Sequence, residues 1–335
     1  MVQGYRLDAK DFKILSVLDR DARQSNSEIG KIVGLSKEVV KYRIDRMIEN
    51  GVILRFHTVI NYFRLGIVKH KLYLKLKNAN KKRLEEIGQH FKKHKKTEWV
   101  VLTSGKWDLI VTFLVKNVNE FDDEVLDMMN RFTDHIQDKA VTTTLYLAHQ
   151  TREFLKGDQG RASSGVVYHT TKDKQEKLDP LDEELLRIIA NNARLPTTEI
   201  ATRLKTTPRV VQYRIRELER KKIILAYKSH LDPKAMGNVF CKAIIYLTNA
   251  NEARINQFTG FASSLPGAVW PQRVLGSWDF EIDFELPSYD VFQDTLLEIK
   301  EKFPDIIKDQ EFTITSKEFK LYLYPGAYPE SFEKR

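Results

Sequence analysis

Two segments of the chain carry basic and polar side chains that could bind the phosphates and base edges of DNA. In the first segment the candidates are Ser36, Lys37, Lys41, Tyr42, Arg43 and Arg46. In the second they are Thr207, Arg209, Gln212, Tyr213, Arg214 and Arg216. Lysine and arginine neutralise phosphates, and arginine and glutamine can make paired hydrogen bonds to guanine and adenine edges. These residues predict double-stranded DNA as a partner, the alternative being charges that only solvate a helix face.

The two segments differ in charge. Residues 207–222 hold six Lys and Arg against two Glu, a net of +4, whereas residues 36–50 hold four against three acids, a net of +1. The whole chain has a net charge of +9, which favours a polyanionic partner only weakly. We therefore expect the second segment to bind phosphate more strongly.

Each segment is predicted to be the third helix of a helix-turn-helix. Asp8 and Ser25 are suited to cap the two preceding helices, and Gly34 suits the left-handed end of the second. Ser36 and Thr207 would cap the two third helices. The residues expected on the buried helix faces are Phe12, Leu15, Leu18, Ile29, Ile32, Val33, Val40, Ile44, Met47, Ile48, Val211, Ile215 and Leu218.

Short β stretches follow each third helix, at residues 54–60 and 225–231, and suit a wing. Arg55, His57, Lys228 and His230 lie on them. These side chains could touch the DNA backbone, although a plain surface role for the histidines is equally compatible with the sequence.

The chain repeats itself at an offset of 171 residues. Leu7 matches Leu178, and the register persists as far as Trp107-Asp108, which matches Trp278-Asp279. Such a register indicates a duplicated unit. Residues 156–177 lie between the copies and are rich in Gly, Ser, Thr and charges, so we expect a flexible linker that lets the copies pair.

The second two-thirds of each copy alternates strand and helix patterns in the order βαββαβ, which is typical of a ferredoxin-like sheet with both helices on one face. Such a sheet leaves its other face uncovered. We expect the face of Leu72, Leu74, Val111 and Phe113, or that of their alternating neighbours, to pack on the equivalent sheet as an intrachain pseudo-dimer.

The residues Leu7 to Ile53, and above all Leu35-Ser36, Arg43-Ile44 and Gly51-Val52-Ile53, resemble the N-terminal domain of the Lrp/AsnC (feast/famine) regulators. The second copy departs from that pattern at Lys222, which replaces the glycine. The resemblance implies an α+β fold with winged helix-turn-helix units and ferredoxin-like effector units. It also implies a transcriptional regulator that forms homo-oligomers. The expected bounds are 1–62 and 178–233 for the DNA-binding units, and 67–155 and 238–325 for the sensor units.

In relatives, a hairpin with a glycine followed three residues later by Asp lies near the small-molecule pocket. Here the corresponding residues are Gly105, Trp107, Asp108, Gly276, Trp278 and Asp279. The resemblance therefore implies an amino-acid effector at these hairpins. The other reading is structural, with glycine allowing the turn, Asp capping it and Trp filling an interface.

A few single residues bear on other functions. His90 and His94 have a metal-binding spacing but no evident third ligand. Siroheme decarboxylases share the two-part architecture, but the histidine of their second sensor strand is absent, because Trp99 and Trp270 begin that stretch here. We expect no enzyme activity and no cofactor, and, without a membrane-length apolar run or signal core, a cytoplasmic protein.

Overall fold

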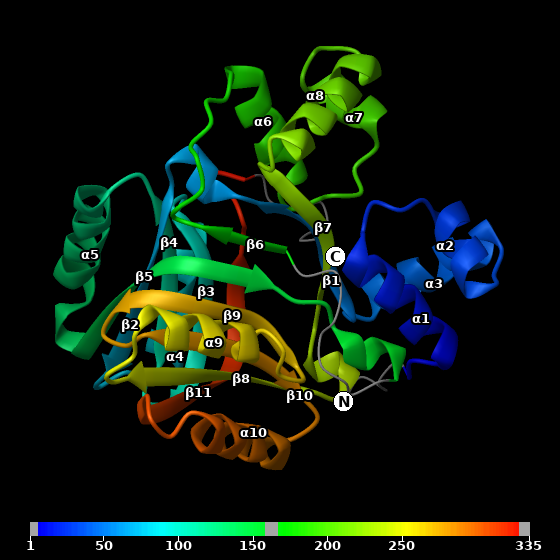
Figure 1. Ribbon diagram of the computed structural model, residues 1–335. Helices are drawn as coiled ribbons and strands as arrows, with labels where there is room; N and C mark the ends of the chain where they lie inside the picture. The colour runs from blue at the N-terminus through cyan, green and yellow to red at the C-terminus, as the bar shows by residue number, and fades with distance from the viewer. Residues whose placement is uncertain (1–5, 158–166, 328–335) are drawn as a thin grey trace.

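The computed structural model describes residues 6–157 and 167–327, and within them the chain folds as two related halves around one central sheet (Figure 1). The first half contains, in order, α1 (Ala9–Arg20), α2 (Asn26–Val33), α3 (Lys37–Glu49), β1 (Ile53–Ile60), η1 (Tyr62–Leu65), β2 (Val68–Leu76), α4 (Lys81–Lys93), β3 (Thr97–Gly105), β4 (Leu109–Val115), α5 (Val118–Phe132), η2 (Thr133–His135) and β5 (Ile136–His149). The connection contains η3 (Glu153–Lys156) and β6 (Val167–Thr170).

The second half repeats this order. It contains α6 (Pro180–Ile189), α7 (Thr197–Arg203), α8 (Pro208–Arg220), β7 (Ile224–Leu231), η4 (Lys234–Met236), β8 (Val239–Leu247), α9 (Glu252–Ala262), β9 (Ala268–Gly276), β10 (Phe280–Leu286), α10 (Tyr289–Lys302) and β11 (Ile307–Leu321). The α+β class expected from the sequence is confirmed, as are two helix-turn-helix units in tandem.

Local capping explains where the first helices begin and end. The Asp8 side chain accepts from the backbone N–H of Asp11, and Ser25 forms a second capping box with Glu28. Gly34 ends α2 with a φ of 68°. Lys222 takes a φ of 54° at the position where the first copy has Gly51 at 70°. The replacement of glycine therefore leaves the backbone path unchanged, although the lysine has to adopt the left-handed backbone conformation that glycine adopts more easily.

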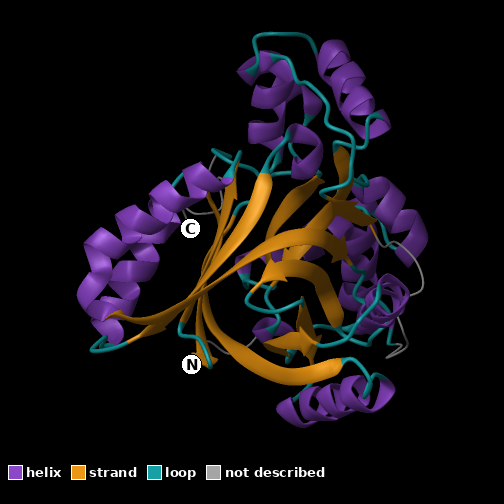
Figure 2. Cartoon of the chain, turned by 60° about the vertical axis from the view of Figure 1, so that its left-hand side comes forward, coloured by secondary structure: helices purple, strands orange, loops and turns teal. Residues whose placement is uncertain are grey.

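The central sheet closes on itself. Its strand order is β2-β4-β3-β11-β8-β10-β9-β5-β6, and an additional pairing joins β2 to β5. Each copy thus supplies four strands in the ferredoxin order, β5-β2-β4-β3 and β11-β8-β10-β9. The copies meet at two antiparallel edges, β3 with β11 and β5 with β9. Figure 2 shows the strands gathered at the centre with helices outside them.

The two faces of each sheet have different partners. Leu72, Leu74, Val111 and Phe113 pack beneath α4 and α5, in one cluster with Ile87 and Phe91. Their alternating neighbours form a different cluster that unites the copies, and its members include Tyr73, Trp99, Val101, Trp107, Ile110, Ile244, Val274, Trp278 and Leu321. The expected packing between copies is therefore made by the second of the two faces considered from the sequence.

Charged side chains also lie inside this closed sheet. Lys71 and Lys242 are each 1% exposed, and both form ion pairs with the buried carboxylate of Glu281. Lys242 also pairs with Asp283 at 2.8 Å, and Lys71 donates to the side-chain oxygen of Gln272 at 2.7 Å. The mutual attraction of these groups counters part of the cost of removing them from water.

Several expectations from the sequence were wrong. Ile32 is 62% exposed rather than buried on α2, and Phe12 and Ile48 are only partly buried. The connection between the copies is not a plain coil in its described part, because β6 pairs with β5 and the Glu176 N–H donates to the Arg64 carbonyl at 2.6 Å. Residues 158–166 of the expected linker lie outside the described residues.

Candidate nucleic-acid interface

The two third helices present most of the candidate DNA contacts to solvent. Ten of the twelve predicted residues are exposed: Ser36, Lys37, Lys41, Tyr42, Arg46, Thr207, Arg209, Gln212, Tyr213 and Arg216. Tyr42 and Tyr213, which match at the repeat offset, are 59% and 64% exposed. Such large exposed aromatic side chains at equivalent positions favour contact with another molecule over a purely solvated helix face.

Capping and packing hold each third helix in place. The Ser36 hydroxyl accepts from the Val39 N–H at 3.2 Å, and the Thr207 hydroxyl accepts from the Val210 N–H at 3.3 Å. On the inner side Val40, Ile44 and Met47 are buried, as are Val211, Ile215 and Leu218. The buried face predicted for α8 is confirmed, and that of α3 is confirmed apart from Ile48.

Arg43 and Arg214 differ from the other candidates because both are engaged within the protein. Arg43 Nη1 donates to Asp8 at 2.8 Å and to Asp11 at 2.9 Å. Arg214 Nη1 repeats the pattern with Asp179 and with Asp182 at 2.9 Å. The hydrogen bond from Arg43 lowers the pKa of Asp8, so the carboxylate stays charged. These two arginines therefore tie the third helix of each unit to the start of its first helix, and their contact with DNA stays a prediction.

The two exposed faces differ in how many side chains are free to bind. Lys41 forms an ion pair with Asp45 on α3, and Arg46 lies over the Tyr42 ring at 5.6 Å. On α8, no hydrogen bond or ion pair joins Arg209, Gln212 or Arg216 to another part of the described chain. The exposed face of α8 therefore has more cationic and amide groups available to bind another molecule than the exposed face of α3.

The strands expected to act as wings pair with each other instead of reaching outward. β1 and β7 form a two-stranded antiparallel sheet, with His57 opposite Lys228. His57 and Lys228 are each 3% exposed, and His230 is 5% exposed. Burial lowers the pKa of His57 to about 3, so its ring is neutral. The suggested phosphate contacts of these three residues were wrong. Arg55 donates to the Leu321 carbonyl at 2.7 Å.

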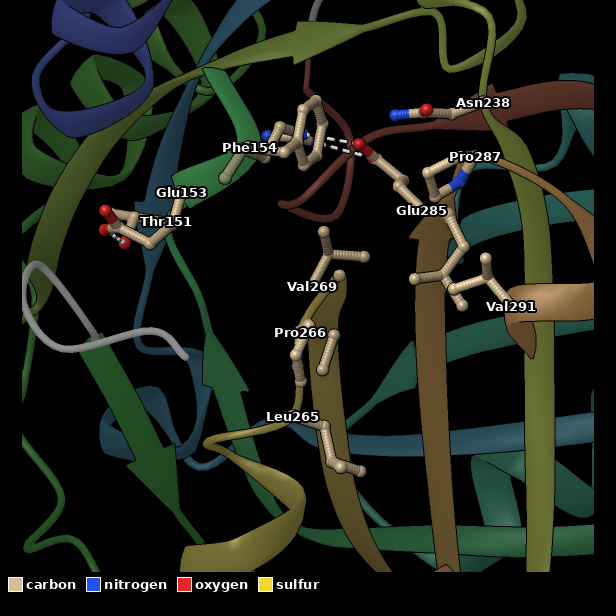
Figure 3. A pocket seen from close by; sticks show the side chains of 14 residues that line it. Thr151, Glu153, Phe154, Asn238, Leu265, Pro266, Val269, Glu285, Pro287 and Val291 are labelled. Atoms are coloured by element: carbon tan, nitrogen blue, oxygen red, sulfur yellow. Dashed lines mark hydrogen bonds and ion pairs between the residues drawn. The ribbon is translucent and has the colours of Figure 1, made fainter. Parts of the chain in front are cut away.

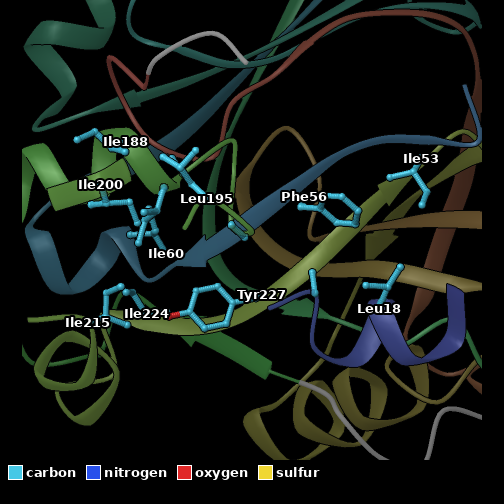
Figure 4. Close-up of a cluster of buried hydrophobic side chains, with 14 of the residues drawn as sticks. Leu18, Ile53, Phe56, Ile60, Ile188, Leu195, Ile200, Ile215, Ile224 and Tyr227 are labelled. Atoms are coloured by element: carbon cyan, nitrogen blue, oxygen red, sulfur yellow. The ribbon is translucent and has the colours of Figure 1, made fainter. Parts of the chain in front are cut away.

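Reciprocal contacts lock the two helix-turn-helix units together. The Ala22 N–H donates to the Tyr227 carbonyl at 2.9 Å, and the equivalent Ala193 N–H donates to the Phe56 carbonyl at 2.8 Å. A single hydrophobic cluster spans both units (Figure 4), in which Phe56 and Tyr227 come from the two paired strands. The units therefore form one body with pseudo-twofold symmetry.

Arginines strengthen the same junction. Arg23 donates to the Ala193 carbonyl at 2.7 Å, and its repeat equivalent Arg194 donates to the Ala22 carbonyl at 2.6 Å. Each guanidinium also lies 5.2–5.3 Å from the centre of an aromatic ring of the other copy. Helices α3 and α8 therefore belong to one packed body.

The two glycine-Asp hairpins are filled by contacts within the protein. Asp108 accepts from the Leu76 N–H at 2.8 Å, and Asp279 accepts from the Leu247 N–H at 2.8 Å. Trp107 and Trp278 are buried, with ring centres 6.2 Å apart. A Cβ atom at Gly105 would come within 2.9 Å of the Phe312 carbonyl oxygen, and one at Gly276 within 2.3 Å of that of Val141. These contacts favour the structural reading of both hairpins.

A metal site and a membrane-spanning helix would each leave a recognisable feature in the structure. Within residues 6–157 and 167–327, no cluster of three or more His, Cys, Asp and Glu side chains is placed to hold a metal ion. His94 instead contacts Glu124, at 2.8 Å. None of the helices in the described part of the chain is long and apolar enough to cross a membrane.

Comparison with known proteins identifies the family. A model for winged helix-turn-helix DNA-binding domains matches residues 7–53 and 178–224. The proline dehydrogenase transcriptional activator of Rhizobium radiobacter is 33% identical over 34% of this chain and 74% of its own length. The HTH-type transcriptional regulator FL11 of Pyrococcus furiosus is 32% identical over 37% of this chain and 80% of its own length.

A solved structure matches nearly the whole chain in fold. The crystal structure of the siroheme decarboxylase NirDL has a TM-score of 0.62 and 14% identity, and covers 97% of this chain and 96% of that one. At that identity the match shows a shared architecture alone.

These matches place the chain in the Lrp/AsnC family of winged helix-turn-helix transcriptional regulators. Within that family it is a tandem form, since both copies carry the DNA-binding unit and each of the two relatives spans little more than a third of the chain.

Proposed function

We propose that this protein is a sequence-specific DNA-binding regulator that reads one asymmetric operator with the two unlike helices α3 and α8. The observation that carries the proposal is the pair of exposed, polar helix faces fixed on one pseudo-twofold body. A helix of this kind reads base edges from the major groove, and two of them need half-sites about 34 Å apart, or a multiple of that distance.

The proposed division of labour follows from the side chains. On α8, Arg209 and Arg216 would neutralise phosphates, while Gln212 has the amide needed for an adenine edge. On α3, Lys37 and Tyr42 would make the corresponding contacts with less charge. The same proposal divides the chain into DNA-binding units (1–62 and 178–233) and sensor units (67–155 and 238–325). It also includes a cytoplasmic location and the assembly of several chains.

Selection of genomic fragments by the full chain, followed by footprinting, tests this reading. We expect one protected site with two dissimilar halves, because the two helix faces carry different side chains. A perfectly palindromic site would contradict binding by one chain. It would indicate instead that like copies from two chains are paired on the DNA.

An enzymatic function is the second candidate, since the NirDL structure shares the whole tandem architecture. In this chain Trp99 lies on β3 and Trp270 on β9, the strands in which those enzymes have their histidine, and Trp99 Nε1 donates to Glu318 at 2.9 Å. Titration with siroheme separates the two classes. A shifted Soret band together with loss of a substrate carboxyl group would favour the enzyme, and its absence together with operator binding would favour the regulator.

A further inference from the structure

A groove of about 780 Å³ on the first DNA-binding unit is lined by α1, the end of α2 and η3. The residues of α1 that line it are Ala9, Phe12, Lys13, Ser16, Val17 and Arg20. They recur every three or four positions, so they form one stripe along the helix. At about 1.5 Å per residue the stripe is about 16 Å long. The groove therefore has the length of about three turns of a second helix.

Apolar side chains make up about half of the lining. They are Phe12, Val17, Ile32, Val33, Phe154 and Leu155. Ile32 is 62% exposed, and Phe12 and Phe154 are only partly buried. In Figure 1 helices α1 and α2 lie at the right-hand edge of the molecule, away from the central sheet. Exposed apolar surface of this kind is typical of a site that another protein covers.

The charged side chains that line the groove are all cations. Lys13, Arg20 and Lys156 line it, and no Asp or Glu of the described residues does. Glu153, outside the lining, pairs with Arg20 at 3.7 Å and with Lys156. No hydrogen bond or ion pair joins Lys13 to another part of the described chain. Because one carboxylate serves these three cations, the groove keeps a positive charge that favours an acidic partner.

Buried ion pairs hold η3 beside α1. Arg152, the residue before η3, donates to Asp19 of α1 at 2.6 Å and to Glu285 of β10 at 2.7 Å, and all three residues are buried. Figure 3 shows Phe154 beside the Glu285 end of these contacts, at a cavity of about 230 Å³. Phe154 lines that cavity as well as the groove. Contacts within the protein therefore set the position of this part of the groove.

The second copy does not repeat this surface. At the repeat offset, Phe12, Lys13 and Ile32 correspond to Glu183, Glu184 and Arg203. Both of these glutamates pair with Arg187 on their own helix, and Arg203 pairs with Glu199. The combination of apolar and basic side chains is thus confined to the first copy, and the common fold alone does not account for it.

We propose that this groove binds an amphipathic, acidic helix of another protein. The apolar face of that helix packs on Phe12 and Ile32, and carboxylates beside it pair with Lys13 and Arg20. Recognition of this type uses apolar anchors at positions i, i+3 or i+4, and i+7 of the bound helix, which the length of the stripe on α1 accommodates. Of the described residues that line the groove, none is among the twelve candidates for DNA contact. The inference therefore adds a protein partner to the proposed DNA binding, at a separate surface.

Fluorescence anisotropy on the full chain tests the groove with a labelled peptide of about four helical turns. Leucines take its anchor positions and glutamates the others. One control peptide has lysine in place of glutamate, and a second has serine in place of leucine. We expect the leucine–glutamate peptide to bind with a Kd of about 0.1 mM or below, and each control peptide at least about tenfold more weakly.

Two variants introduce the side chains that the second copy has at the equivalent positions. Ile32→Arg removes apolar surface but adds a cation, so it should weaken the leucine–glutamate peptide by about fivefold or more, whereas attraction between opposite charges alone would make binding tighter. Lys13→Glu should weaken it by about tenfold or more. Lys31→Glu is the matched control, because Lys31 is exposed on α2, undergoes the same change of charge and does not line the groove.

Equal binding of the three peptides, unchanged or tighter binding by Ile32→Arg, or equal weakening by Lys13→Glu and Lys31→Glu would overturn the site. Displacement of the peptide by an operator fragment would show that DNA occupies the groove, and would refute a separate protein surface. Sedimentation of the full chain tests the remaining occupant. Loss of assembly in Ile32→Arg would assign the groove to a second copy of this chain and refute a different partner, and unchanged assembly would support one.

Discussion

The charge asymmetry of the two recognition helices leads to a prediction about salt. Arg209 and Arg216 are exposed on α8 and have no partner in the described chain, whereas the neighbouring Arg214 is occupied by Asp179 and Asp182. If both free arginines contact phosphates, the double variant Arg209→Ala/Arg216→Ala removes two phosphate contacts and leaves the anchoring of α8 intact.

The expected size follows from counterion release. Each phosphate contact contributes about 0.9 to the slope of log affinity against log salt, so two contacts contribute about 1.8. Between about 50 and 200 mM salt the logarithm of the concentration rises by about 0.6, and the wild-type chain should therefore lose about twelvefold more affinity than the variant. The difference should be largest at low salt, where phosphate contacts are strongest.

Fluorescence anisotropy with one operator fragment at several salt concentrations measures the slope. The charge-matched control is Lys300→Ala/Lys308→Ala, which removes two exposed cations from α10 and β11 of the second sensor unit. An unchanged slope in the α8 variant would refute the phosphate contacts. An equal change in the control would show that total charge, and not the α8 face, sets the salt dependence. Lys37→Ala/Lys41→Ala should have a smaller effect, because Lys41 is already paired with Asp45.

Three other predictions concern buried charges. Arg43→Ala should lower the free energy of unfolding by about 1–3 kcal/mol in chemical denaturation, because the buried Asp11 carboxylate loses its ion pair with Arg43; an equal loss in Lys37→Ala would contradict this. Burial lowers the pKa of His169 to about 3, so the unfolded state binds a proton that the folded state refuses, and stability should fall as the pH drops from about 6.5 to about 3. His169→Gln should reduce that slope by up to about 1.4 kcal/mol per pH unit, and identical pH profiles would exclude the mechanism. Lys71→Met should lower the free energy of unfolding by about 3–5 kcal/mol, because it leaves Glu281 with one lysine. Adding Glu281→Gln should restore part of this free energy, and no recovery would refute the pairing.

Local signals made the helices predictable. Asp8, Ser25 and Gly34 cap the helix ends for which the sequence predicted them, and the third helices bury the expected apolar side. The offset of 171 residues predicted the two related halves, because a register that long requires a common fold. Packing between the copies was expected, since each half had an apolar face without a cover, whereas the pairing of their edge strands into one closed sheet was not.

Contacts between segments far apart in the sequence were not predictable from local patterns. The strands after α3 and α8 have the length and polarity of wings, and only their mutual pairing buries His57 and His230. The ion pairs of Arg43 and Arg214 within the protein were not expected, because their acidic partners lie about 35 residues away in sequence. The duplication held a usable signal, since Asp8, Asp11 and Arg43 all recur at the repeat offset.

The charges inside the closed sheet favour the pairing of two unlike copies over the pairing of two like copies. Glu281 and Asp283 belong to the second copy, and the first has Ile110 and Thr112 at those positions, while both copies carry the lysine. Two first copies would bury a pair of lysines without these carboxylates, and two second copies would bury four carboxylates against two lysines. The gene thus encodes two complementary, unlike halves in one polypeptide, and these halves are always made in equal number and inherited together. A substitution at this interface in one half can then be compensated by a substitution in the other half of the same chain.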